Sequence, residues 1–471
     1  MSENRTLQLF KVLSKKELKV FDKFVRSPVY NQHQDVIILF EYLKTNIKNE
    51  GSKIDNKKLF ESLFPKQPFE IQKLHHLNSY LLKLLEQFFA WQEWQKEEQK
   101  SQIYLLRSYR KRQLSSHFDR IFSKLEKSQR NTISRNRAFH SREYNRLIER
   151  VKADSGKRSA NIPIQELSDT QDIFFIIEKL YNACTMVSHQ AVVKKEYDTG
   201  LLEPILNFLE NSEWMKEPAV AIYYYSYKAL SDNDDFSSFN ELKSLLQNYV
   251  SGSFLPSELR DHYLIAINFC TRQINRGNKE FLREGFDFYK LGLKAEVFFE
   301  NGQLSRLTYK NIVVIGLQLE EYEWVYNFIV EYAERLSAKI RADNKNHNLA
   351  HYFYEVKNYN QAMQLLVRTE FDNVLHNMFG KMLLAKMYYE LKEQNALDNL
   401  LLSFKVYIHR HKELGYHKTN YLNFIKYTKH LIKVNFYDKT ALDRLTNRIK
   451  KEQYLVERKW LLERVDLLGG N

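Results

Sequence analysis

The stretch Asn348–Leu366 reads NLAHYFYEVKNYNQAMQLL. Its apolar residues follow helical spacing on both sides of Lys357-Asn358, and this dipeptide predicts a tight turn between two amphipathic helices. A helical hairpin of this kind cannot bury its apolar face alone, so the stretch predicts packing against further hairpins. The apolar positions are Leu349, Ala350 and Phe353 in the first helix and Tyr359, Ala362 and Leu366 in the second.

The hairpin pattern recurs on both sides of this stretch. An offset of 35 residues brings the apolar positions onto other apolar residues, except that Tyr359 falls on polar Gln394. Upstream, Tyr322–Ile329 matches Tyr359–Leu366 at an offset of 37. We therefore predict successive hairpins, with the pattern clearest between residues 304 and 412. The downstream matches are Leu384, Ala385, Tyr388, Leu397 and Leu401.

The recurring pattern has a small or apolar residue, an aromatic residue three positions later and an alanine twelve positions later. It resembles the tetratricopeptide repeat (TPR), whose period is ~34 residues. Ala350 and Ala385 stand where the TPR pattern has a glycine, and its first-helix tryptophan and closing proline are absent. The resemblance implies a TPR-like α-solenoid of helix hairpins that binds a protein or peptide partner on its concave surface.

Glycine and proline are scarce throughout the chain. Its 471 residues include 13 Gly and 7 Pro, about 4% together, against an average of ~12%. A sheet-rich protein needs many more turn residues, so the composition predicts an all-α fold. We expect an N-terminal helical domain in residues 1–99, an Arg-rich helical segment and linker in residues 100–160, and TPR-like helical repeats in residues 161–471. A long helix over Asp438–Leu468 is expected to cap the repeats.

Residues that could hold a metal or a disulfide are few. Cys184 and Cys270 are too few for a disulfide framework and too far apart for a metal knuckle. The pairs His75-His76 and His409-Arg-His411 lack the spacing that places two imidazoles together on a helix. We expect no metal and no cofactor. The first residues carry no apolar signal core, and no apolar run reaches the ~20 residues that span a bilayer, so we expect a cytoplasmic protein without a membrane partner.

Basic charge is concentrated in two blocks. The formal net charge of the chain is +14. Residues 107–158 hold 16 Lys and Arg against 5 Asp and Glu, and residues 405–466 hold 15 against 7. The rest of the chain therefore carries a net charge of −5. The positions of these two blocks are more informative than the overall balance of charge.

The first block holds the strongest candidate for a binding site. Six arginines recur along a predicted helix, with Phe139 and Tyr144 between them. Arginine forms bidentate contacts with phosphate, so the pattern predicts contacts to nucleic acid or to another anion. The alternative is a solvated face, or arginines that pair with acidic residues elsewhere in the chain. The candidate contacts are Arg130, Arg135, Arg137, Arg142 and Arg146, followed by Arg150.

Motifs of known catalytic chemistry are missing from the sequence. The chain carries no Gly-rich dinucleotide fingerprint and no Gly-x-Ser-x-Gly elbow, and Gly156-Lys157 lacks the upstream glycine and strand of a phosphate loop. We therefore expect a non-enzymatic scaffold or adaptor that binds a protein partner. The alternative is an RNA- or DNA-associated factor that uses the Arg107–Arg158 block and binds more weakly as salt rises. An enzyme whose site is assembled from distant residues is a third class, because sequence spacing does not report spatial convergence.

Overall fold

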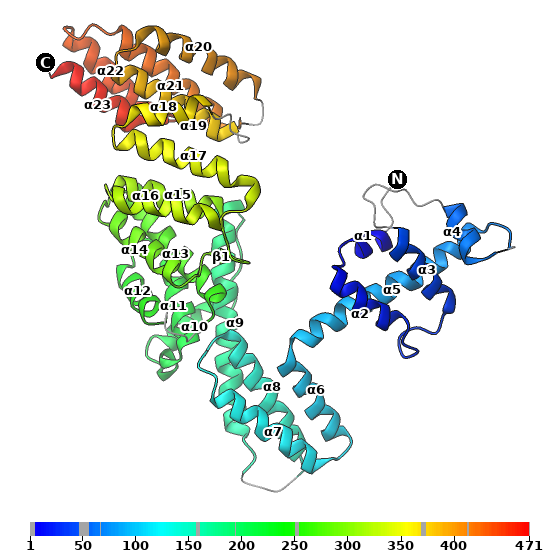
Figure 1. Cartoon of the computed structure of the whole chain (residues 1–471). Coiled ribbons are helices and arrows are strands. Elements are labelled where there is room, and N and C mark those ends of the chain that lie inside the picture. The colour runs from blue at the N-terminus through cyan, green and yellow to red at the C-terminus, as the bar shows by residue number, and fades with distance from the viewer. Residues whose placement is uncertain are drawn as a thin grey trace. The chain divides into compact units, whose positions relative to one another are not determined.

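The computed structural model describes residues 5–46, 56–65, 67–156, 161–193, 195–249, 254–368, 374–411 and 414–470. The protein is all-α, as predicted, with 79% of its residues in helices (Figure 1). Within these ranges the sheet content is one antiparallel ladder of β1 (Phe299–Glu300) and β2 (Gln303–Leu304). None of the described helices combines the length and the apolar character that crossing a bilayer requires.

The chain divides into two compact units, unit 1 with residues 1–176 and unit 2 with residues 177–471. The boundary lies within one long helix, α9 (Ile164–Val193). The predicted boundaries after residues 99 and 160 stay predictions, because a two-part division does not test them. The helices of unit 1 before α9 are α1 (Arg5–Lys11), α2 (Lys15–Val25), α3 (Gln34–Asn46), α4 (Asn56–Leu63), α5 (Ile71–Lys96), α6 (Glu98–Lys111), α7 (Ser115–Arg130) and α8 (Arg137–Asp154).

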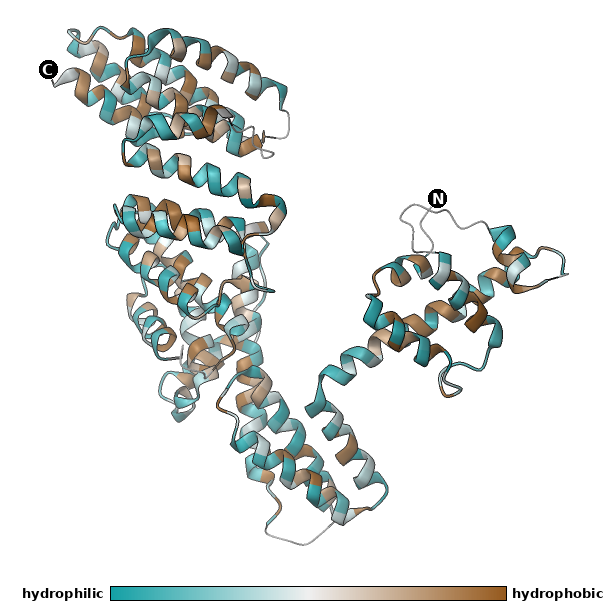
Figure 2. Cartoon of the chain, viewed as in Figure 1, coloured by the Kyte–Doolittle hydropathy of each residue, from teal (hydrophilic) through white to brown (hydrophobic). Residues whose placement is uncertain are grey.

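Hydrophobic clusters of two sizes lie among the described residues of unit 1. The larger one is built by α1–α5, where Phe21, Phe40 and Phe88 are fully buried and the ring of Phe21 contacts the other two. Figure 2 shows hydrophobic and hydrophilic residues interspersed along these helices, as expected for helices that bury one face. The smaller cluster lies between α6 and α7 and contains Leu106, Phe118 and Ile121.

Helix pairs follow one another in unit 2. From α11 to α20, each odd-numbered helix packs against the even-numbered helix after it, and α17 also contacts α15 and α19 (Figure 1). The hairpins predicted around Leu349 and Leu384 therefore lie against each other. The helices after α9 are α10 (Leu202–Leu209), α11 (Pro218–Ser231), α12 (Phe236–Tyr249), α13 (Pro256–Asn275), α14 (Phe281–Lys294), α15 (Arg306–Gln318), α16 (Tyr322–Tyr332), α17 (Ala338–Glu355), α18 (Tyr359–Arg368), α19 (Val374–Glu390), α20 (Gln394–Arg410), α21 (Tyr416–Lys433), α22 (Lys439–Lys451) and α23 (Arg458–Gly469), with short 3-10 helices η1 (Glu213–Lys216) and η2 (Ala333–Arg335).

The stretch that predicted a hairpin forms α17, a tight turn and α18. Lys357 adopts a left-handed φ of 60°, and the backbone N–H of Asn358 donates to the carbonyl of Phe353 at 2.8 Å. The same left-handed conformation follows α15 at Glu320 and α19 at Lys392. These two residues are 37 and 35 positions from Lys357, so the turn geometry repeats at the two predicted offsets. The small residues Ala350, Ala362 and Ala385 are fully buried.

The C-terminal helices differ from the prediction. The single helix predicted over Asp438–Leu468 is wrong, because the chain forms α22 and α23 with a break between them. Glu457 has a left-handed φ of 56° just before α23. The guanidinium of Arg458 donates to the carbonyls of Ile449 at 2.6 Å and Lys450 at 2.7 Å, which caps the end of α22. The break lets α23 fold back onto α22, and both share one hydrophobic cluster with α17–α21.

Candidate functional site

The predicted arginine helix is two helices joined by a short connection. Arg130 ends α7, Arg135 lies in the connection, and Arg137 begins α8. The Asn136 side chain caps α8 by accepting a hydrogen bond from the backbone N–H of Phe139 at 2.8 Å. The prediction of one continuous helix is therefore wrong, and the arginines do not share one helical face.

A buried carboxylate neutralises the arginines at the start of this block. Glu149 in α8 has a fully buried side chain and accepts from Nε of Arg107 and from Nε of Arg110 in α6, each at 2.8 Å. Burial alone would raise the pKa of Glu149. The hydrogen bonds and positive charges of the two arginines outweigh burial and hold that pKa below its ordinary value of 4.5.

Arg146 and Arg150, farther along α8, are paired as well. The side chain of Arg146 is only 6% exposed, lies 2.5 Å from the Glu143 carboxylate and stacks over the Phe122 ring at 4.5 Å. Arg150 bonds to Asp119 at 2.6 Å. Because Phe122 and Asp119 belong to α7, these arginines join α8 to α7. Their charges serve the packing of unit 1.

The other candidates of the block lie nearer the surface. Arg130 has a side chain that is 75% exposed and pairs with Glu126, one helical turn away, at 2.9 Å. The guanidinium of Arg135 lies over the Phe139 ring, 4.3 Å from its centroid. Arg158, at the end of the block, lies outside the described residues. Exposed cations therefore remain in this block: Arg130 at the end of α7, and Arg120, Lys124 and Lys127 within that helix.

A cavity of about 190 Å³ lies between α6, α7 and α8. Its wall brings Arg142 and Arg146 together with Arg107 and Lys100. Arg146, Arg107 and Lys100 already pair with carboxylates of the same unit. The geometry of this cavity favours the alternative in which these arginines pair within the chain.

A second basic surface lies between α21 and α22, inside the C-terminal charge block. Two adjoining hollows of about 400 Å³ each share Arg444 and Arg448 in their walls. Lys433 lines one hollow and Lys451 the other. Arg444 donates to the Thr440 carbonyl of its own helix at 3.2 Å, and none of the four cations forms an ion pair with a described residue. We call the surface lined by these four cations the basic groove.

The positive potential of the basic groove acts on His430, which lines it. Burial lowers the pKa of His430, and the neighbouring charges of Lys426 and Arg448 lower it further. Two carboxylates also lie in the walls: Asp438 caps α22, and Glu452 pairs with Lys426 at 3.7 Å. Cations therefore outnumber carboxylates along the groove.

An apolar pocket adjoins the basic groove at Val434, which lines both. The pocket has a volume of about 560 Å³ and lies where α19, α21 and α23 end and α20 begins. Phe436 and Leu467 in its wall are 47% and 59% exposed. Arg464 also lines it and pairs with Glu390 at 3.7 Å and Glu463 at 4.0 Å, although its buried Nε has no hydrogen-bond acceptor among the described residues. We call it the terminal pocket; its apolar wall contains Leu397, Leu431, Ile432, Val434, Phe436 and Leu467.

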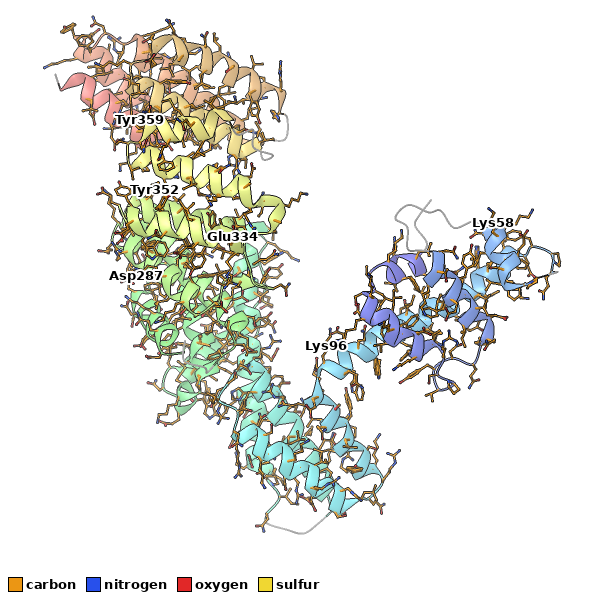
Figure 3. All side chains as sticks on the ribbon, viewed as in Figure 1. Lys58, Lys96, Asp287, Glu334, Tyr352 and Tyr359 are labelled. Atoms are coloured by element: carbon orange, nitrogen blue, oxygen red, sulfur yellow. The ribbon has the colours of Figure 1, made fainter. Side chains whose placement is uncertain are left out.

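Glu390 lines the terminal pocket and joins four helices. Its carboxylate accepts from Nε1 of Trp460 at 2.7 Å, from the Tyr354 hydroxyl at 3.0 Å and from the hydroxyl of Tyr359. Figure 3 labels the position of Tyr359. Burial alone would raise the pKa of Glu390, but these hydrogen bonds and the charge of Lys357 hold it below its ordinary value of 4.5. The carboxylate thus fixes α17, α18 and α23 against α19, which shapes the pocket.

Sequence reasoning missed the terminal pocket and the partners of Glu390. Glu390 and Trp460 are 70 residues apart, and no local pattern relates them. The basic groove did leave a signal. Arg444, Arg448 and Lys451 recur at spacings of four and three, which places them on one side of a helix. That spacing, added to the net charge of residues 405–466, could have identified the surface.

Comparisons with other proteins give no information on the function of these surfaces. No protein-family model, curated protein or solved structure matches the chain. Across the described ranges, no group of three or more His, Cys, Asp or Glu side chains is placed to hold a metal ion. The features with the clearest binding chemistry are the basic groove and the terminal pocket.

Proposed function

We propose that this chain is a non-enzymatic scaffold that binds a protein partner, and that the helix pairs of unit 2 form a TPR-like α-solenoid. The left-handed turn that recurs at Glu320, Lys357 and Lys392 supports the repeat assignment. The helix pairs that contact one another in succession support it too. Stacked hairpins give extended surfaces for partners rather than enclosed catalytic sites.

The observation that carries the proposal is the terminal pocket. Its wall is mainly aliphatic and aromatic, and Phe436 and Leu467 leave about half of their surface to solvent. Apolar side chains that gather around an open hollow are typical of protein interaction sites. A volume of about 560 Å³ has room for apolar side chains of a partner. Partner binding on the concave surface of the repeats stays a prediction.

Affinity capture with pocket variants tests the proposal. The full chain is immobilised and exposed to a lysate of the source cells, beside a Phe436→Ala/Leu467→Ala variant. A Leu307→Ala/Leu402→Ala variant is the matched control, because these leucines are 65% and 57% exposed and neither lines the pocket. We expect a reproducible set of proteins that the wild type and the control retain and the pocket variant loses.

Contact at the pocket is checked by a photo-crosslinking residue in place of Tyr437, which is 81% exposed and adjacent to Phe436. The crosslinked product should contain one of the proteins lost by the pocket variant. Recovery of nucleic acid without any reproducible protein partner would contradict the proposal. Equal retention of every protein by the pocket variant would contradict it as well.

Nucleic-acid binding through the Arg107–Arg158 block stays the alternative prediction. It is tested by retention on heparin after Arg130 and Arg135 are replaced by Gln. The side chain of Arg130 is 75% exposed, so its loss removes surface charge with little effect on packing. Arg146 is less suitable for this test, because its side chain is only 6% exposed and its loss would disturb the fold. Unchanged retention would exclude Arg130 and Arg135 as the phosphate contacts.

A further inference from the structure

The basic groove and the terminal pocket form one continuous surface. The two hollows of the groove share Arg444 and Arg448, and the groove shares Val434 with the pocket. The α22 helix that forms one wall has 13 residues, which corresponds to a length of ~20 Å. A single extended or helical segment of a partner is long enough to contact both parts.

The basic groove carries more cations than carboxylates among its described residues. Lys433, Arg444, Arg448 and Lys451 face the groove without a carboxylate partner there. In the pocket wall, Arg464 pairs with Glu390 at 3.7 Å and with Glu463 at 4.0 Å, while its buried Nε–H has no acceptor among the residues that the structure describes. Because Arg464 already has carboxylate partners, the part of the surface that complements negative charge is the basic groove.

We propose that this surface binds an acidic segment of the protein partner, with an apolar side chain in the terminal pocket and carboxylates along the basic groove. This inference rests on the proposed scaffold function and adds the chemistry of the partner to it. Arg444 and Arg448 supply planar guanidinium groups that match carboxylate geometry. Phe436 and Leu467 border the position of the apolar anchor.

The lining of the pocket favours a peptide over a nucleic acid. Single-stranded nucleic acids bind along successive aromatic platforms beside cations. Tyr388, Tyr389 and Phe436 line this pocket, but its six aliphatic residues, among them Leu431 and Leu467, outnumber them. Aliphatic walls select leucine-like or phenylalanine-like anchors. Binding of a nucleic acid instead of a peptide would therefore contradict the inference.

The test selects ligands by chemistry rather than by name. A random phage-displayed library of peptides of about 12 residues, which extend to ~40 Å, is panned on the immobilised full chain. We expect enrichment of sequences in which Asp and Glu flank a Leu or Phe. An enriched peptide, labelled with fluorescein, should lose about tenfold or more in affinity for an Arg444→Glu/Arg448→Glu variant, the effect of losing about 1.4 kcal/mol of charge interaction.

A matched variant separates groove charge from total charge. Lys405→Glu/Lys450→Glu changes the net charge equally and replaces two exposed lysines that line neither hollow nor pocket. Lys450 and Arg448 both lie in the last turn of α22. A glutamate at either position therefore interacts similarly with the C-terminal end of the helix dipole. This control should keep the affinity of the wild type within about twofold. Circular dichroism checks that each variant is folded. If Arg444→Glu/Arg448→Glu is unfolded, Arg444→Gln/Arg448→Gln takes its place.

Three results would overturn the inference. The first is enrichment of neutral or basic peptides, and the second is equal affinity of the acidic peptide for the groove variant and the wild type. The third is binding of oligothymidylate, lost with Arg444→Glu/Arg448→Glu, when no peptide is enriched. Neutral peptides that need Phe436 and Leu467 would refute the acidic segment and leave the scaffold function standing. If the Phe436→Ala/Leu467→Ala variant also retains every protein from the lysate, the proposed scaffold function and the acidic-segment inference are both refuted.

Discussion

Two basic regions of this chain use positive charge in opposite ways. In the Arg107–Arg158 block, Glu149 is buried between Arg107 and Arg110, and an ion pair of Arg150 with Asp119 joins α8 to α7. In the basic groove, Arg444 and Arg448 face open hollows without a carboxylate partner among the described residues. The comparison shows that a charge count along a sequence does not distinguish charge used for packing from charge available for binding.

The difference follows from where the acidic residues fall. Glu149 lies in the middle of α8, on the side that faces α6. The carboxylates beside the groove lie at helix ends, where Asp438 caps α22 and Glu452 follows its last residue. Capping and pairing with Lys426 occupy these two groups. The cations on the exposed side of α22 are left for a ligand.

Removal of the buried carboxylate in the first region should have the largest effect. Glu149→Ala would leave Arg107 and Arg110 without their partner, and we expect the α6–α8 region to lose about 3–5 kcal/mol of stability. Hydrogen exchange of peptides from α6–α8 measures this locally, as a chain of two units requires. Glu126→Ala is the control, because Glu126 pairs with exposed Arg130, and its loss should cost about 0.5 kcal/mol. Equal effects of the two variants would contradict the description of a packed charge cluster.

Loss of the Glu390 carboxylate should have the next largest effect, in unit 2. Glu390→Ala would leave Trp460, Tyr354 and Tyr359 without their common acceptor, and we expect a loss of about 2–3 kcal/mol. Hydrogen exchange of α19 and α23 should increase together. Glu334, labelled in Figure 3, pairs with Arg341 and is 69% exposed, so Glu334→Ala is the control. Exchange that rises in α19 alone would show that Glu390 does not anchor α23.

As the pH falls, unit 2 should lose stability before the ion pairs of Glu149 with Arg107 and Arg110 are weakened. His262 is buried, its Nδ1 lies 2.7 Å from the Ser226 hydroxyl, and burial lowers its pKa to about 3 from an ordinary 6.5. Between these values the unfolded chain binds a proton that the folded chain excludes, so stability is full above pH 6.5 and falls as pH drops toward 3. The loss is about 1.4 kcal/mol per pH unit, or about 2 kcal/mol by pH 5.

This acid effect is measured by denaturant-dependent hydrogen exchange of α13 at pH 7 and pH 5. In His262→Gln, the stability difference between the two pH values should shrink by about 2 kcal/mol. The ion pairs of Glu149 with Arg107 and Arg110 should keep stabilising α6–α8 over the same range. The pKa of Glu149 is below 4.5, so its contribution to the stability of unit 1 is lost only at lower pH. An unchanged pH dependence in His262→Gln would contradict this account.

The smallest predicted effect reports the potential of the basic groove directly. The charge of Arg448 is one of the causes that lower the pKa of His430, so Arg448→Gln should raise that pKa toward 6.5. Nuclear magnetic resonance titration of the His430 ring measures the shift. Lys450→Gln removes an equal charge outside the groove and should leave the pKa of His430 unchanged. A pKa that responds equally to both variants would show that the groove has no local field.

Hairpins in unit 2 were predictable because each one carries its own local signal. Alanines at Ala350 and Ala385 and the offset of 35 residues mark the same place in successive pairs, and the left-handed turns at Lys357 and Lys392 fall where a helix pattern ends. Local spacing of this kind survives in the fold because a hairpin packs mainly on its neighbours.

Features that depend on distant residues were not predictable. Apolar periodicity continues through residues 438–468, and the sequence alone did not reveal that Arg458 would cap α22 and let α23 turn back. The pairing of Arg107 with Glu149 spans 42 residues. The arginines therefore looked like one basic stripe, although the helix is interrupted at Asn136. Contacts between residues distant in the sequence determine both the break between α22 and α23 and the pairing of the arginines.

The position of α23 has a consequence for how this protein can be handled. Lys386 of α19 is 5% exposed and reaches Glu457 at 2.7 Å, while Glu390 of the same helix binds Trp460. A shortened chain that stops after α22 would leave the Lys386 ammonium without Glu457 and the Glu390 carboxylate without Trp460, on an apolar helix that α23 no longer covers. Expression of separate pieces should therefore keep α19 and α23 in the same polypeptide, or the fragment will self-associate through the surface that α23 normally shields.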